Sequence, residues 1–87
     1  MEFEWDEAKR ASNLAKHGLD FADVARVGWD NAAVEPDLRF NYGEARFRAF
    51  GRLDGELFSI AFTLRSGVVR ILSFRFANRK ERRTYGP

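Results

Sequence analysis

The amino-acid sequence predicts one α+β domain: an antiparallel sheet with two N-terminal helices on one face, followed by a C-terminal helix. Three observations predict this fold class. Helix caps and apolar spacing occupy the first 28 residues, three β-rich runs joined by short turns occupy residues 46–76, and a helix-start signal follows at Asn78. A chain of 87 residues with 45% hydrophobic content is enough for one core, so a single domain is expected over residues 1–87.

The N-terminal segment carries the signals of a short strand and two helices. Phe3 and Trp5 alternate with acidic residues, which is typical of a strand with one buried face. Asp6 is placed to cap a helix that ends near His17, before the left-handed stop of Gly18. Asp20 is placed to cap a second helix, and the residues expected on its buried stripe are Phe21, Val24, Ala25 and Gly28. Residues 29–44 lose the pattern and predict a loop.

The next segment predicts a three-stranded antiparallel meander. Strands are expected over residues 46–52, 56–64 and 68–76, with turns at Asp54-Gly55 and Ser66-Gly67. Two-residue turns would pair Leu53 with Glu56 in the first hairpin and Arg65 with Val68 in the second, and each step back along one strand is then matched by one step forward along the other. That register places on the core face Phe47, Ala49, Gly51, Phe58, Ile60, Phe62, Leu64, Val69, Ile71, Ser73 and Arg75. It places on the second face Arg46, Arg48, Phe50, Arg52, Ser59, Ala61, Thr63, Arg65, Arg70, Leu72, Phe74 and Phe76.

Composition excludes several classes of site. The chain has no Cys and a single His, which excludes a disulfide framework and a thiol nucleophile and argues against a metal site or cofactor. No apolar run approaches the roughly 18 residues of a membrane span, and the acidic N-terminus is unlike a signal peptide. We therefore expect a cytoplasmic protein without a membrane partner.

The charge is divided unevenly along the chain. Residues 1–37 carry four Lys or Arg against nine Asp or Glu, a net −5, whereas residues 38–87 carry eleven against four, a net +7. Twelve of the fifteen basic residues are Arg, whose planar fork matches phosphate. A basic half rich in Arg and Phe favours binding to nucleic acid, with an ordinary solvated sheet face as the alternative.

Three side chains near the helix ends are candidates for proton transfer. His17 is the only side chain with an unperturbed pKa near neutrality, although a basic residue before Gly18 also complements the helix dipole. Glu81 has two possible roles, which are to complete a capping box with Asn78 or to transfer a proton. Tyr85 follows Glu81 by four residues and so lies on the same side of the predicted helix, which begins at about Arg79.

The sequence also resembles the BrnT family of bacterial toxins. The matching features are the opening Phe3-Glu4-Trp5-Asp6 with Lys9, then Asn13, the Lys16-His17-Gly18 triplet and Phe21, later Gly51, Thr63 and Arg65, and finally the C-terminal series. That series comprises Arg70-Ile71, Ser73, Arg75, Ala77, Glu81 and Tyr85. These features occur together in the family's order and spacing and cover nearly the whole chain.

The resemblance implies a RelE-like fold and a ribonuclease that arrests translation. It also implies a hetero-oligomer with a BrnA-type antitoxin, whose ribbon-helix-helix part binds operator DNA. RNA cleavage without a metal ion needs a base, an acid and cations on the phosphate. We expect Arg65 and Arg75 to stabilise phosphate charge and Glu81, Tyr85 or His17 to move protons. The residues expected to hold the RNA are Arg46, Arg48, Arg70 and Lys80. The alternative is a non-catalytic module that binds RNA or only buffers its antitoxin.

Overall fold

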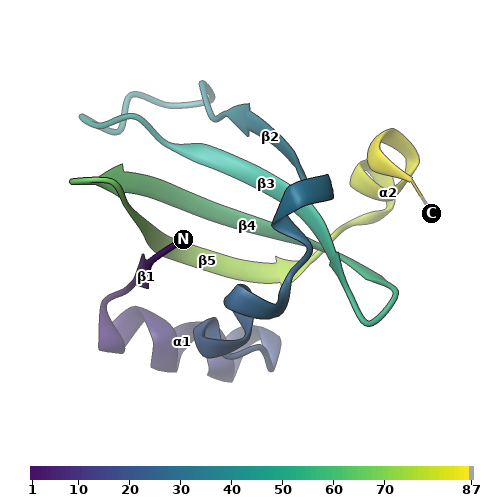
Figure 1. The fold of residues 1–87 in the computed structure, drawn as a ribbon, viewed down its shortest axis with the longest axis horizontal. Helices are drawn as coiled ribbons and strands as arrows, with labels where there is room; N and C mark the ends of the chain where they lie inside the picture. The colour runs from purple at the N-terminus through teal and green to yellow at the C-terminus, as the bar shows by residue number, and fades with distance from the viewer. Residues whose placement is uncertain (87) are drawn as a thin grey trace.

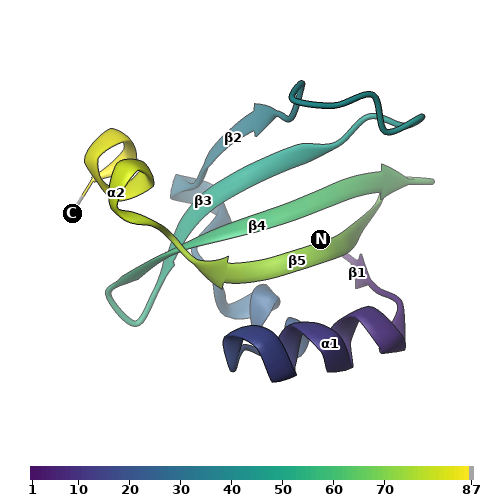
Figure 2. The ribbon, with the colours of Figure 1, turned by 180° about the vertical axis from the view of Figure 1, so that it is seen from behind.

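The computed structural model describes residues 1–86 and shows a five-stranded sheet in the order β1-β5-β4-β3-β2 (Figure 1). The elements are β1 (Phe3–Glu4), α1 (Glu7–His17), η1 (Phe21–Arg26), η2 (Trp29–Asn31), β2 (Ala33–Pro36), β3 (Phe47–Leu53), β4 (Glu56–Arg65), β5 (Val68–Phe76) and α2 (Arg79–Tyr85). Helix α1 runs along β5, and α2 lies beyond the end of β5 (Figures 1 and 2). No helix within residues 1–86 is both long and apolar enough to cross a membrane.

The sheet is mixed, so the predicted purely antiparallel sheet is wrong at one edge. Strand β1 pairs in parallel with β5, through Phe3 with Val69 and Glu4 with Arg70, while the other neighbours are antiparallel. The parallel pair arises because the chain leaves β1 directly into α1 and returns only after the whole meander. The meander itself, predicted from its turn residues, is confirmed.

The N-terminal segment contains one α-helix rather than two. Helix α1 begins after Asp6, whose carboxylate accepts hydrogen bonds from the backbone N–H groups of the first turn, and ends at Gly18 with φ 70°. The second predicted helix is the 3₁₀ helix η1, with Asp20 as its N-cap. Three residues per turn align Phe21, Val24 and Val27 on the buried side. The predicted burial of Ala25 and Gly28 is therefore wrong, and both are exposed.

The predicted loop over residues 29–44 holds the short helix η2 and an edge strand, β2. Strand β2 ends at Pro36, which an edge position tolerates because proline has no N–H to donate to a further strand. The segment around η2 lies close to β3 at Gly51. A Cβ at this position would lie 2.7 Å from Val27 Cγ1, so only glycine permits the observed approach.

The register of the second hairpin changes partway along because β5 contains a bulge. The first hairpin has the predicted pairing throughout, from Leu53 with Glu56 to Phe47 with Phe62. In the second, Phe62 pairs with Ile71 as predicted, but Ala61 pairs with Ser73, which leaves Leu72 as an extra residue. One extra residue exchanges the two faces beyond it.

The bulge corrects the predicted facing of the end of β5. Phe74 is 1% exposed and belongs to the core, with its ring centroid 5.1 Å from that of Phe58. Phe76 also lies against Phe58 but remains 49% exposed. Ser73 and Arg75, predicted on the core face, lie instead on the opposite face.

A buried asparagine joins α1 to the edge of β5 beyond the end of β1. The Asn13 side chain donates to the Phe74 carbonyl oxygen at 2.8 Å and accepts from the Phe74 backbone N–H at 3.1 Å. It therefore satisfies the two backbone groups that a neighbouring strand would otherwise bond. This contact fixes the end of β5, from which the chain turns toward α2.

Candidate functional site

Small residues of β4 form the floor of the sheet face opposite α1. Strand β4 contributes Ser59, Ala61 and Thr63, which alternate with its core residues. Their antiparallel partners place arginines on both sides, because Arg48 pairs with Ala61, Arg75 with Ser59 and Arg70 with Thr63. We call this surface the arginine face.

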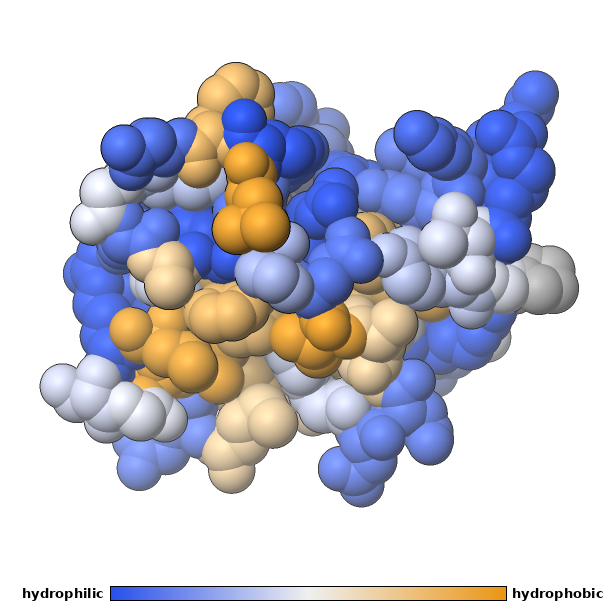
Figure 3. All heavy atoms as spheres, turned by 90° about the horizontal axis from the view of Figure 1, so that it is seen from above, coloured by the Kyte–Doolittle hydropathy of each residue, from blue (hydrophilic) through white to orange (hydrophobic). Residues whose placement is uncertain are grey.

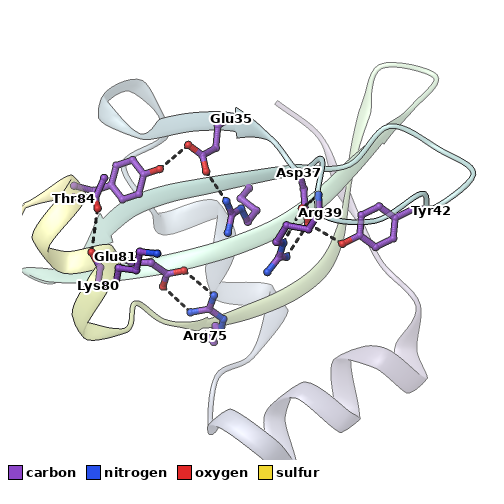
Figure 4. Close-up of polar contacts among 10 residues, drawn as sticks. Glu35, Asp37, Arg39, Tyr42, Arg75, Lys80, Glu81 and Thr84 are labelled. Carbon is purple, nitrogen blue, oxygen red and sulfur yellow. Dashed lines mark hydrogen bonds and ion pairs between the residues drawn. The ribbon is translucent and has the colours of Figure 1, made fainter.

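One end of the arginine face is hollowed into a groove of about 260 Å³, closed on one side by α2. Its lining residues come from β2, the segment after β2, β3, β5 and α2, and they are Glu35, Arg39, Arg48, Phe50, Arg75, Asn78, Lys80, Glu81, Thr84 and Tyr85. Figure 4 shows Glu35 above the groove, with Arg75 and Glu81 facing one another across from it. The name groove is kept for this site.

Arg75 and Glu81 form the firmest ion pair of the groove. Two guanidinium nitrogens of Arg75 donate to the two carboxylate oxygens of Glu81 at 2.8 and 2.9 Å. Glu81 Oε1 also accepts from the Asn78 backbone N–H, and Asn78 Oδ1 accepts from the Glu81 backbone N–H, which completes a capping box. The hydrogen bonds from Arg75 lower the pKa of Glu81, so its carboxylate remains ionised at neutral pH.

Glu35 joins Arg48 to Tyr85 on the other side of the groove. Arg48 Nη2 donates to Glu35 Oε1 at 2.6 Å, and the Tyr85 hydroxyl donates to Glu35 Oε2 at 2.6 Å. The Tyr85 ring stacks on Phe50 with centroids 4.2 Å apart and planes at 11°. Its hydrogen bond to Glu35 raises the pKa of Tyr85, so the phenol keeps its proton at neutral pH.

Arg48 makes fewer hydrogen bonds to a carboxylate than Arg75, the arginine on the opposite side of the floor. It makes one hydrogen bond to Glu35, whereas Arg75 holds Glu81 through two. Its Nε is buried and, within residues 1–86, has no hydrogen-bond partner. A buried donor without an acceptor destabilises the unbound state, so a ligand oxygen that reached it would be favoured.

The structure brings five of the nine residues predicted from the sequence into the groove: Arg48, Arg75, Lys80, Glu81 and Tyr85. The other four lie elsewhere. Arg46 and Arg65 both contact Glu44, at 3.3 and 3.5 Å, and Arg70 contacts Glu4 at 2.5 Å. Arg65 lies six residues along β4 from Ser59, the partner of Arg75, which is roughly 20 Å. Arg65 and Arg75 therefore cannot contact one phosphate together in this arrangement.

His17 lies beside β5 but outside the groove. It shares a hollow with Lys16, Asn13, Leu72 and Ser73. Burial first, then the positive charges of Lys16 and Arg75, lower the pKa of His17. The imidazole is therefore neutral at physiological pH, which is compatible with a base. His17 is near enough to Arg75 to feel its charge, but it does not line the groove.

Three groove residues, Glu35, Arg39 and Thr84, were not singled out from the sequence. Glu35 lies in the strand that the sequence did not reveal, and its partners Arg48 and Tyr85 are 13 and 50 residues away. Glu35 could have been placed opposite Arg48 only if the pairing of β2 with β3 had been known. Within residues 1–86, no three His, Asp or Glu side chains lie close enough to hold a metal ion.

Comparison with known families identifies the chain. Residues 5–81 match the family model described as the ribonuclease toxin BrnT of type II toxin-antitoxin systems. The match begins after β1 and ends at Glu81, so it includes all of the groove residues except Thr84 and Tyr85. A comparison with curated proteins found no match. Because the family match spans most of its length, the chain belongs to the BrnT family of ribonuclease toxins of type II toxin-antitoxin systems.

Proposed function

We propose that the protein cleaves RNA in the groove without a metal ion, that this arrests translation, and that a BrnA-type antitoxin neutralises it. The observation that carries the proposal is the convergence of Arg48 and Arg75 with a carboxylate and a phenol whose pKa values shift in opposite directions. At neutral pH the ionised Glu81 carboxylate can accept a proton and the protonated Tyr85 phenol can donate one, so the two groups can fill the roles of base and acid in one reaction.

The protonation states of Glu81 and Tyr85 set the direction of the proton transfers. Glu81 Oε2 accepts one hydrogen bond, from Arg75, and has a lone pair left to accept the proton of a ribose 2′-hydroxyl. The 2′-oxygen then attacks phosphorus, the bond from phosphorus to the 5′-oxygen breaks, and Tyr85 donates a proton to that leaving oxygen. The products are a 2′,3′-cyclic phosphate and a free 5′-hydroxyl, and Tyr85 regains a proton from solvent as Glu81 releases its own.

The arginines supply the positive charge that the transition state requires. Arg48 is expected to exchange its single bond to Glu35 for a forked contact with the phosphate, which also gives its Nε an acceptor. Arg75, held by Glu81, adds charge from the opposite side of the floor, and Lys80 adds charge at the rim. The carboxylates thus hold the arginines in place until RNA replaces one of them.

The experiment is a cleavage assay on the purified protein with end-labelled RNA in EDTA. We expect cleavage with 2′,3′-cyclic phosphate ends. Tyr85→Phe keeps the ring stacked on Phe50 and removes the proton, so the single-turnover rate should fall about 10²- to 10⁴-fold with little change in RNA affinity. Glu81→Gln keeps an acceptor for the Asn78 N–H and should also slow the reaction.

A surface arginine on the helix-covered side provides the control. Arg26→Ala removes one positive charge from η1 and should leave the rate unchanged. Cleavage that requires added metal would contradict the mechanism, as would a fully active Tyr85→Phe. RNA binding without any cleavage would support the non-catalytic alternative.

The antitoxin is expected to cover the groove and α2. Helix α2 carries Arg79, Lys80, Arg82 and Arg83, and within residues 1–86 no carboxylate lies within ion-pair distance of them. Such a surface attracts an acidic segment and raises its association rate at low salt. Association with the product of the adjacent gene should therefore slow as salt rises and in the double variant Arg79→Glu, Arg83→Glu. A rate indifferent to both changes would place the antitoxin elsewhere.

A further inference from the structure

The segment between β2 and β3, residues 37–46, is a braced loop. Asp37 is buried. Its carboxylate accepts hydrogen bonds from the Arg39 backbone N–H at 3.2 Å, from two nitrogens of the Arg39 guanidinium at 2.8 Å each, and from the Tyr42 hydroxyl at 3.0 Å. The Asp37 backbone N–H donates to the Arg46 carbonyl oxygen at 2.8 Å. Figure 4 shows this network at the opposite end of β2 from Thr84. The loop is therefore held in one shape by its own polar groups. We call it the braced loop.

The braced loop points its large apolar side chains outward. Leu38 is 84% exposed and Phe40 is 69% exposed, and the Phe40 ring meets only the edge of Tyr42, with centroids 5.8 Å apart at 72°. Figure 3 looks down on the side of the molecule that carries β2 and shows hydrophobic side chains next to hydrophilic ones on that side. A braced loop that leaves an aromatic ring in water is suited to a ligand that covers the ring.

Positive charges flank the exposed ring and connect it to the groove. Arg39, next to Phe40 in the chain, lines the groove. The Arg46 guanidinium lies 4.2 Å from the Tyr42 ring centroid, on the ring that Phe40 contacts. Aromatic rings interleaved with arginines form the stacking surfaces on which single-stranded nucleic acids bind, because each base has a flat face and each linkage a negative charge.

We propose that the braced loop is a base-stacking platform, on which an unpaired nucleotide beside the cleaved linkage stacks on Phe40 while Arg39 and Arg46 hold its backbone. The inference rests on the proposed function and adds to it that the substrate is single-stranded at this position. A protein partner is the less favoured occupant. A stable protein interface needs about 800 Å² on each side, whereas one exposed ring is sufficient for one base.

The test measures the affinity of RNA that cannot be cut. A single-stranded RNA with a 2′-O-methyl group at every position is titrated against the parent, Phe40→Ala, Phe40→Trp and Leu38→Ala. Phe40→Ala should weaken binding about 5- to 150-fold, and Phe40→Trp should retain it. Leu38→Ala, a matched loss of an exposed apolar side chain from the same loop, should bind as the parent does. RNA with one abasic position at the stacked site should bind the parent and Phe40→Ala equally.

Three results would overturn the platform. These are unchanged affinity in Phe40→Ala, equal losses in Phe40→Ala and Leu38→Ala, or a Phe40→Ala defect confined to the antitoxin complex, which would make the loop a protein-docking surface. Because this RNA cannot react, a failure of cleavage in the parent would defeat the proposed function without altering these affinities. The two proposals therefore fail separately.

Discussion

The bulge in β5 is tested by comparing two phenylalanines that are two residues apart. A straight strand would carry Phe74 and Phe76 on the arginine face, whereas the bulge turns both toward the core side and buries only Phe74. We predict that Phe74→Ala destabilises the protein far more than Phe76→Ala does.

The magnitudes follow from the exposed fractions. Phe74 is 1% exposed, so its truncation loses the whole transfer free energy and leaves a cavity beside Phe58, at about 3 to 5 kcal/mol. Phe76 is 49% exposed and loses about half of a side chain's burial, or about 1 kcal/mol. For a domain of this size, 1 kcal/mol corresponds to roughly 4 to 8 °C in Tm.

The assay is urea unfolding followed by circular dichroism, with the free energies extrapolated to water. If Phe74→Ala does not fold, Phe74→Leu and Phe76→Leu give the same ranking at a smaller loss. Equal losses at the two positions, or a larger loss at Phe76, would mean that β5 runs straight. Arg75 would then face α1 rather than Glu81, and the groove as described would not form.

Two further predictions concern packing and acid stability. Gly51→Ala should destabilise the fold by about 1 to 3 kcal/mol in the same urea assay, because the new methyl group would overlap Val27; an unaltered midpoint would show that the segment joining η1 to η2 does not lie against β3. Arg10 lowers the pKa of Asp20 to about 2 through two hydrogen bonds, so this pair stabilises the fold above about pH 4 and the contribution is lost as the pH falls through 2. Arg10→Ala should flatten the dependence of stability on pH between 4 and 2, and an unchanged slope would show that the pair contributes nothing there.

The hairpins were predictable from local chemistry. Asp54-Gly55 and Ser66-Gly67 are turn pairs whose residues all adopt positive φ, and two-residue turns fix the register of the strands they join. The caps Asp6, Asp20 and Asn78 likewise act within a few residues. Each of these signals is local, and α1, η1 and α2 each begin directly after the predicted cap.

The bulge and the edge strand were not predictable from local chemistry. Residues 68–76 hold one weak cue, because the polar position is even-numbered at Arg70 and odd-numbered at Ser73 and Arg75. Val68 and Leu72 add apolar side chains to the face of Arg70, so this change of phase does not by itself locate a bulge. The run Ala33-Val34-Glu35-Pro36 is too short to show a period, and Pro36 is typical of a loop. Both features depend on contacts distant in sequence, such as Asn13 with Phe74 and β2 with β3.

The candidate site depends on these two features, which explains why only part of it was predicted. Glu81 and Tyr85 could be paired from helical spacing alone. The bulge brings Arg75 to Glu81, and β2 brings Glu35 to Arg48 and Tyr85. Arg65 was grouped with Arg75 because the family resemblance supplies residues without distances.

The most direct test of the groove compares two arginine removals in the same cleavage assay. Arg48→Ala and Arg26→Ala each remove one positive charge, but Arg48 lines the groove and Arg26 lies in η1. If RNA is cut in the groove, the single-turnover rate in EDTA should fall about 10²-fold or more for Arg48→Ala and stay at the parent value for Arg26→Ala, with both variants folded by circular dichroism. Equal rates in the two variants would contradict the assignment of RNA cleavage to the groove.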